Sequence, residues 1–290
     1  MDWNKILMKK ARPVIAKLKT FPEVKAIVFG GSVGGGIADE HSDIDITAFV
    51  TKVPDEKSRK AVWGRQKKYF KVPHSTIDFF LVGDRDCDIF YQDISTLEDS
   101  VERFLKGSDW DEVTAHRLTR IVKIVYDPEG IVRGLQKRVE AYPKWLKEKL
   151  YVLKLMRVRG SVEKMNNMLK RGNWFLMDKL LSDCTADIVH VLYGLNSAYF
   201  TAEYWPRWFV YDVKKFRILP PRAYERLEEI VRLNNRTDLI EKVDAMNSMV
   251  NDLEVLYKRQ IKLKGHRSKA ATARHLKNLK KTYARIRHDL

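Results

Sequence analysis

The sequence has few cysteines and no long apolar run, and both absences narrow what the chain can be. Only two cysteines occur among 290 residues, Cys87 and Cys184, far apart and with no second Cys or His at metal-ligand spacing. This excludes a disulfide framework and a cysteine-rich zinc site, and we expect free thiols in a reducing compartment. No apolar stretch approaches the roughly 18 residues that a membrane span needs, and residues 1–20 lack the apolar core of a signal peptide. A cytoplasmic protein is expected.

Acidic residues are outnumbered, because 38 Asp and Glu stand against 55 Lys and Arg and give a formal net charge of +17. Such an excess is typical of proteins that bind nucleic acid or an anionic substrate, and also of a merely solvated basic surface. Part of it belongs to the segment 258–290, in which Asp289 is the single acid. The hydrophobic content of 44% is that of a globular protein, and 290 residues are enough for two domains.

The hydrophobic pattern changes character near residues 128–145, where we place a domain boundary. Before it, the pattern predicts a leading helix and four short strands, at residues 1–20, 24–30, 43–50, 75–82 and 88–95. A helix is predicted next, opening with a capping box from Ser95 to Glu98. After the boundary almost every segment has helical periodicity.

The last long helical segment carries an apolar stripe with alternating spacings of four and three residues, formed by Leu239, Val243, Met246, Val250, Leu253 and Tyr257. This spacing predicts a helix packed into a bundle, and it also fits a coiled-coil seam between two copies of the chain. We therefore expect a monomer or a homodimer.

Two aspartates, Asp43 and Asp45, interrupt a segment that otherwise has the pattern of a buried strand. Residues i and i+2 of a strand share a face, so the two carboxylates lie on the same side. Their mutual repulsion and partial burial need compensation, which a divalent cation provides. Mg²⁺ typically takes one or two carboxylates together with substrate phosphates. The pattern therefore favours a metal site that handles a phosphate-bearing substrate.

A glycine-rich loop, GGSVGGG at residues 30–36, precedes these aspartates. Gly30 and Gly31 leave room for backbone amides to approach a phosphate, and Ser32 adds a hydroxyl donor. The loop is not a Walker A motif, because no Lys-Ser or Lys-Thr pair follows the glycines, and it lacks the dinucleotide-binding register.

A third acid, Asp78, lies in the apolar segment 75–82. If its strand lies beside the strand of Asp43 and Asp45, three carboxylates line one site, and Asp78 is then a metal ligand or the general base. The acids of GDRDCD, namely Asp84, Asp86 and Asp88, are interpreted as a turn after that strand. A role in holding a cationic acceptor is the alternative for them.

The stretch FGGSVGGGIADEHSDIDITAFV resembles the nucleotidyltransferase superfamily that includes DNA polymerase β and the antibiotic nucleotidyltransferases. Members carry Gly followed by Gly or Ser, then an Asp-hydrophobic-Asp on the next strand and a later acid, a pattern matched by Gly31, Ser32, Asp43, Asp45 and Asp78. The chain looks most similar to two-domain members related to kanamycin and lincosamide nucleotidyltransferases. The resemblance is specific over residues 24–82, looser to about residue 232 and absent beyond.

This resemblance implies an α+β fold: a catalytic domain with a small mixed sheet over residues 1–135, a helical domain over 136–257 that closes on the nucleotide, and a basic tail over 258–290. It also implies two Mg²⁺ ions held by Asp43, Asp45 and Asp78, and a nucleoside triphosphate, ATP first, that gives its nucleoside monophosphate to a hydroxyl and releases pyrophosphate. Gly30, Gly31 and Ser32 would bind the phosphates.

The sequence departs from its relatives directly after the Gly-Ser pair, where they commonly carry Arg and this chain has Val33 and three glycines. The triphosphate then needs another cation, and Arg171 is our candidate, although an exposed Arg before a glycine helix stop has the same pattern. Asn196, in LYGLN, either lines the cleft or caps a helix.

Three functions fit these observations. The first is Mg²⁺-dependent transfer of a nucleoside monophosphate to a hydroxyl of a small polar molecule. The second is the same transfer to RNA or protein, for which the positive charge favours RNA. The third is a nucleotide-binding or RNA-binding module without turnover, against which the retained acids Asp43, Asp45 and Asp78 weigh.

Overall fold

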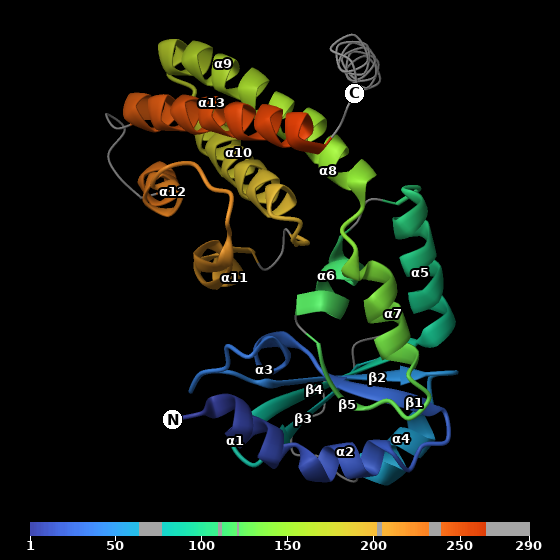
Figure 1. The fold of residues 1–290 in the computed structure, drawn as a ribbon. Coiled ribbons are helices and arrows are strands. Elements are labelled where there is room, and N and C mark those ends of the chain that lie inside the picture. Colours follow the sequence, from blue (N-terminus) through green and yellow to red (C-terminus); the bar gives the residue numbers. More distant parts are fainter. Residues whose placement is uncertain (64–76, 110–111, 121, 202–204, 232–238, 265–290) are drawn as a thin grey trace. The chain divides into compact units, whose positions relative to one another are not determined.

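The computed structural model describes residues 1–63, 77–109, 112–120, 122–201, 205–231 and 239–264. The chain divides into two compact units, Met1–Ala141 and Tyr142–Leu290, which are described separately (Figure 1). The first unit contains a five-stranded mixed sheet with helices, and the second is built of helices. The predicted α+β class, a small mixed sheet followed by a helical region, is confirmed.

The sheet of the first unit has the strand order β3-β4-β2-β1-β5. Its strands are β1 (Val24–Phe29), β2 (Ile44–Val50), β3 (Ile77–Val82), β4 (Arg85–Asp93) and β5 (Lys123–Tyr126). The β2–β4 pair is parallel, and the other pairs are antiparallel. The fourth strand begins earlier than predicted, and it lies between β2 and β3.

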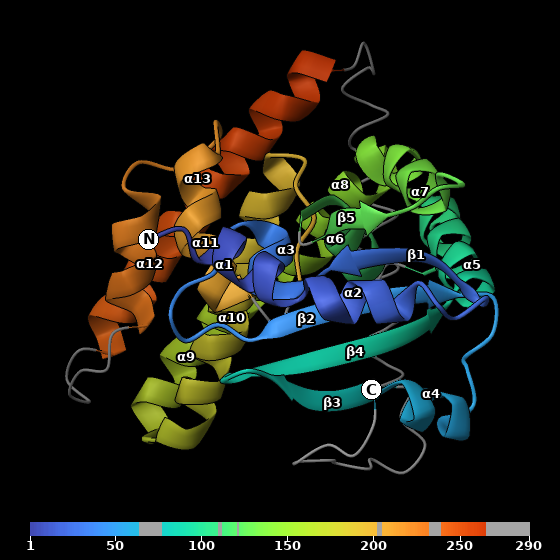
Figure 2. The same cartoon turned by 90° about the horizontal axis from the view of Figure 1, so that it is seen from below.

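Helices cover both faces of this sheet (Figures 1 and 2). One face carries α1 (Trp3–Lys10), α2 (Arg12–Leu18) and α4 (Glu56–Trp63), and the other carries α5 (Ile94–Lys106), α6 (Val113–Arg120) and α7 (Ile131–Glu140). A short helix, α3 (Gly31–Gly35), leads from β1 towards β2. The core on the α1–α2 face joins Leu7 and Leu18 to Ile44, Ile46 and Ile89.

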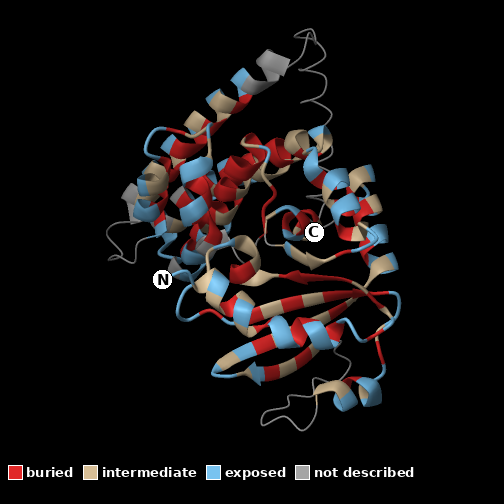
Figure 3. Ribbon diagram, turned by 60° about the horizontal axis from the view of Figure 1, so that its bottom comes forward, coloured by how far each residue is buried: buried red, intermediate tan, exposed pale blue. Residues whose placement is uncertain are grey.

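Burial alternates along the strands, and this alternation places the acids (Figure 3). On β2 the side chains of Ile44 and Ile46 are fully buried, whereas Asp45 between them is half-buried. On β4, Cys87 and Ile89 are likewise buried and Asp88 is half-buried. Because neighbours along a strand point to opposite faces, the aspartates lie on the face away from the α1–α2 core.

Two helix starts in this unit can be compared with the sequence pattern. The leading segment 1–20 is two helices that meet at Ala11, with Pro13 in the first turn of α2. The N-cap of α5 is Asp93 and not Ser95, because the Asp93 carboxylate accepts a hydrogen bond from the Thr96 amide at 3.1 Å. The capping-box pattern therefore misplaced the helix start by two residues.

The second unit contains α8 (Lys144–Leu150), a π-helical turn (Tyr151–Leu155), α9 (Met156–Arg171), α10 (Trp174–Leu195), α11 (Trp205–Asp212), a 3-10 turn (Val213–Lys215), α12 (Ala223–Val231) and α13 (Leu239–Lys264). The stripe residues Val243, Met246, Val250, Leu253 and Tyr257 of α13 are buried in its core. The bundle interpretation of this stripe is thereby confirmed. No helix within the described ranges has the length and apolar character required to cross a bilayer.

Candidate active site

The glycine turn after β1 is built around a close approach to β2. The Gly30 amide donates a hydrogen bond to the Asp45 carbonyl oxygen, with an N–O distance of 2.9 Å. Gly31 follows with a φ of +49°, in the left-handed region. A Cβ atom at Gly31 would lie 1.8 Å from Oδ2 of Asp45, so only glycine lets the Asp45 carboxylate rest against this turn. The turn and the aspartate are therefore one structural unit.

Ser32 is the second residue of α3 and is 4% exposed. Its hydroxyl has no hydrogen-bond partner among the residues that the structure describes. An unsatisfied buried hydroxyl costs about 1–3 kcal/mol, which a bound acceptor would recover. Backbone hydrogen bonds fix the turn around it, from Gly34 N to Gly30 O at 2.7 Å and from Ile37 N to Ser32 O at 3.0 Å. The hydroxyl is thus a donor held in place at the glycine turn.

Two carboxylates, those of Asp45 and Asp88, share one face of the sheet, and that of Asp45 lies beside this turn. In the parallel β2–β4 pair Asp45 is in register with Asp88, so their side chains share the face. Asp43 precedes β2 by one residue and is exposed. Burial, followed by the charges of Asp43 and Asp86, raises the pKa of Asp88 to about 6. The like charges thus add to burial in disfavouring the ionised form of Asp88.

The donor set fits a magnesium ion. All the candidate ligand atoms are carboxylate oxygens, which Mg²⁺ prefers. Within the described ranges, no three His, Cys, Asp or Glu side chains form a ready-made ligand cluster. Mg²⁺ commonly binds through one or two carboxylates and completes its shell with water and substrate phosphate, so a closed cluster is not required. Asp43 and Asp45 would hold the ion, and Ser32 lies at the turn that would meet the phosphates.

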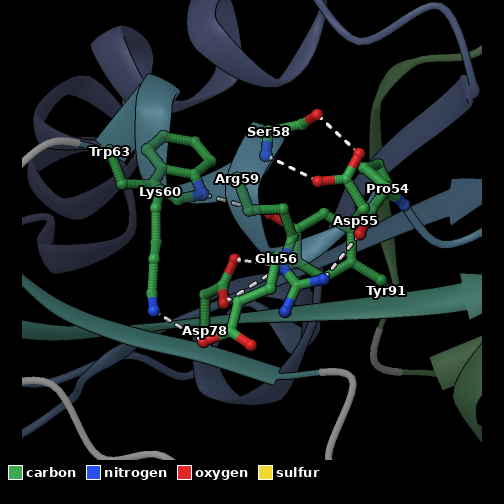
Figure 4. Close-up of polar contacts among 9 residues, drawn as sticks. All are labelled: Pro54, Asp55, Glu56, Ser58, Arg59, Lys60, Trp63, Asp78 and Tyr91. Atoms are coloured by element: carbon green, nitrogen blue, oxygen red, sulfur yellow. Dashed lines mark hydrogen bonds and ion pairs between the residues drawn. The ribbon is translucent and has the colours of Figure 1, made fainter.

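Asp78 does not belong to this group of carboxylates. Since β4 separates β3 from β2, the predicted neighbourhood of the two strands is wrong. Asp78 is in register with Ile89, so its side chain lies on the face opposite Asp45 and Asp88. There it is 4% exposed and forms an ion pair with Arg59, with Nε–Oδ distances of 3.1 and 3.3 Å (Figure 4).

Asp88 is the acid that sequence reasoning missed. The interpretation of GDRDCD as a turn holds only for its first residues, because Asp86 and Asp88 lie on β4. The signal was present, since Asp86 and Asp88 alternate with Cys87 and Ile89 as Asp43 and Asp45 alternate with their own apolar neighbours. What the sequence could not supply was the parallel register that sets Asp88 beside Asp45.

Two candidates from the helical region have different outcomes. Arg171 is the exposed last residue of α9, followed by Gly172 with a φ of +64°. Its predicted part in nucleotide binding stays a prediction. Asn196 caps α10: its side-chain amide donates to the carbonyls of Leu192 and Ile218, each at 2.9 Å, and its oxygen accepts from the Ile218 amide at 2.9 Å. This satisfied side chain has the capping role.

Comparisons with known proteins add the following. A family model described as a domain of unknown function (DUF4037) matches residues 110–208, a stretch that contains neither the glycine turn nor the aspartates. No curated protein matches the sequence. Among solved structures, a nucleotidyltransferase-like protein from Exiguobacterium sibiricum is 11% identical, with a TM-score of 0.42, over 87% of this chain and 75% of its own. An aminoglycoside 6-adenyltransferase from Bacillus subtilis is also 11% identical, with a TM-score of 0.34, over 95% of this chain and 98% of its own.

One solved structure is described as a nucleotidyltransferase-like protein, and the other as an aminoglycoside 6-adenyltransferase. At these identities and TM-scores the likeness says nothing of acceptor, metal or catalytic residues. The assignment of a reaction to this chain therefore depends on its own residues.

Proposed function

We propose that the chain is a Mg²⁺-dependent nucleotidyltransferase that moves a nucleoside monophosphate from a nucleoside triphosphate, ATP first, to a hydroxyl of a small polar acceptor. The observation that supports this most is the contact between Gly31 and the Asp45 carboxylate. It joins the glycine turn, with its buried serine hydroxyl, to the carboxylate of Asp45. Phosphate binding and metal binding would then occur side by side.

Each part of the site has a role in this reaction. Asp43 and Asp45 would hold the metal, which when bound neutralises charge on the phosphates and on the leaving oxygen. The Ser32 hydroxyl and the amides of the glycine turn would donate to the terminal phosphates. Arg171 is kept as the proposed further cation for the triphosphate. In the transfer, the acceptor oxygen forms a bond to the α-phosphorus, the bond from that phosphorus to the bridging oxygen breaks, and pyrophosphate leaves.

Asp88 would take the proton that the acceptor hydroxyl loses. It shares the face of Asp45, as a base that must reach the attacking oxygen requires. Asp78, which is held by Arg59 on the other face, has no direct part in the proposed chemistry.

The test is nucleotidyl transfer by the parent chain and by matched aspartate variants. Each α-labelled triphosphate is incubated with Mg²⁺ and either a pool of hydroxyl-bearing small molecules or total RNA. We expect label in the small-molecule pool and pyrophosphate release, both lost in Asp43→Asn, Asp45→Asn and Asp88→Asn but retained in the exposed control Asp84→Asn. Label in RNA would show that the acceptor is RNA and not a small molecule. Nucleotide binding without pyrophosphate release in either pool would establish the binding module instead.

A further inference from the structure

A buried ion pair lies on the face of the sheet opposite the aspartates, between α4 and β3. The side chains of Arg59 and Asp78 are 11% and 5% exposed. Both carboxylate oxygens of Asp78 accept from Arg59 Nε, and Arg59 also donates through a terminal nitrogen to the Pro54 carbonyl at 2.6 Å (Figure 4). Such a pair is costly to bury, and the loss of one partner leaves an uncompensated charge.

Two aromatic residues extend this pair to the neighbouring strand. The Arg59 guanidinium lies 5.2 Å from the ring centroid of Tyr91 on β4. The Tyr91 hydroxyl accepts a hydrogen bond from Trp63 Nε1 of α4 at 3.2 Å. Burial, followed by the charge of Asp78, raises the pKa of Tyr91, so the phenol stays neutral. These four side chains, Arg59, Trp63, Asp78 and Tyr91, form what we call the α4 clamp, which joins α4, β3 and β4.

The clamp holds a strand whose register matters to the proposed site. In the described sheet, β3 is an edge strand that pairs with β4 alone, and Phe79 of β3 is directly opposite Asp88. A shift of β3 by one residue would move every β3 side chain to the other face. Asp78 would then join Asp45 and Asp88 and add a further negative charge. The best-attested use of a buried polar pair is to specify one register over another.

We propose that the Arg59–Asp78 ion pair locks the register of β3 against β4, the strand that carries Asp88, so that Asp78 supports the metal site without touching the metal. This inference rests on the proposed function for the role of Asp88. The pair keeps Asp78 compensated on the α4 face, where Arg59 and Tyr91 satisfy it. It leaves the opposite face to the carboxylates that are in register with Asp45.

The test compares Arg59→Met, Asp78→Leu and the double variant, which replaces the ion pair by apolar side chains of similar size. The probes are the affinity of the full chain for Mn²⁺ alone, measured by electron paramagnetic resonance, and amide hydrogen exchange of residues 77–93. A control, Arg138→Met, removes an exposed ion pair between Arg138 of α7 and Glu102 of α5 and should change neither measurement.

We expect each single variant to weaken Mn²⁺ binding about tenfold, the lower end of what loss of an outer-shell partner costs a metal site. Amide exchange of β3 should become faster in the same variants. The double variant should recover both properties, because apolar pairs commonly replace buried ion pairs without loss of stability. If the single variants do not fold, the Mn²⁺ affinity and amide exchange of the double variant still test the proposal.

Two results would overturn the proposal that the ion pair fixes the register of β3. A folded double variant that has lost Mn²⁺ binding would make Asp78 a ligand. Folded single variants that bind Mn²⁺ as the parent does would leave the pair without influence on the site. Failure of the proposed function is a separate outcome, because it appears in the parent chain as absence of nucleotidyl transfer, whereas Mn²⁺ affinity and amide exchange do not depend on transfer.

Discussion

Substitution of Gly31 by alanine should disable the site through a single added methyl group. The new Cβ would lie 1.8 Å from Asp45 Oδ2 and 2.9 Å from its Cγ, and real Cβ contacts essentially never fall below 3.0 Å. The carboxylate must therefore move by more than 1 Å, or the turn must shift. The alanine would also occupy a φ of +49°, which is disfavoured for any residue with a Cβ.

The expected magnitudes follow from these two effects. Left-handed backbone costs an alanine about 1–2 kcal/mol, and forcing a methyl group into a filled space adds about 1–3 kcal/mol. We expect Gly31→Ala to lose about 2–4 kcal/mol of unfolding free energy in urea titration. A displacement of about 1 Å at a reacting group can lower the rate about a hundredfold. The rate of pyrophosphate release should therefore fall by about this factor in protein that is still folded.

Gly36 provides a matched control, since its φ is +76° and no atom lies within 4 Å of a Cβ built there. Gly36→Ala should show the backbone cost of about 1–2 kcal/mol without the second effect, and it should retain most of the transfer rate. The reasoning is refuted if the two variants lose the same stability and the same activity. In that case the contact between Gly31 and Asp45 positions nothing.

Two further predictions concern pH. The pKa of Asp88 is raised to about 6, so the stability this group contributes is present below its ordinary pKa and is lost as pH rises through 6. After allowance for the partial exposure of Asp88, Asp88→Asn should stabilise the metal-free protein by about 1 kcal/mol at pH 8 and should have no such effect at pH 3.5. Urea unfolding in EDTA measures this difference. Equal effects at both pH values would contradict the electrostatic account. Burial, then Arg120 and Arg117, lowers the pKa of His116 to about 4, so its contribution is present above its ordinary pKa of 6.5 and is lost as pH falls towards 4. Across that window the protein should lose about 3 kcal/mol, and His116→Gln should flatten the profile, whereas an unchanged profile would show that the imidazole is accessible to protons when folded.

The sequence predicted the local geometry of the candidate site better than the order of its strands. The alternation around Asp43 and Asp45 depends only on the period of a strand, and the glycine turn depends only on the absence of a Cβ, so both can be predicted from the sequence. The order of the strands cannot be predicted in this way, because it is decided by pairing between distant segments. Pairing between distant segments also explains why α9 runs through Gly160, because packing against α10 and α13 outweighs the modest helix penalty of one glycine.

The sequence pattern does not distinguish Asp78 from Asp88, whereas their electrostatic surroundings do. Each is an acid flanked by apolar residues on a strand, and nothing local separates them. The structure distinguishes them by their surroundings: Asp78 meets a guanidinium and a phenol, whereas the charges that act on Asp88 are those of other carboxylates. A carboxylate that its own protein compensates is part of the fold, and one that it leaves among like charges needs a cation from outside. By this criterion the face that we propose to bind the metal is that of Asp45 and Asp88.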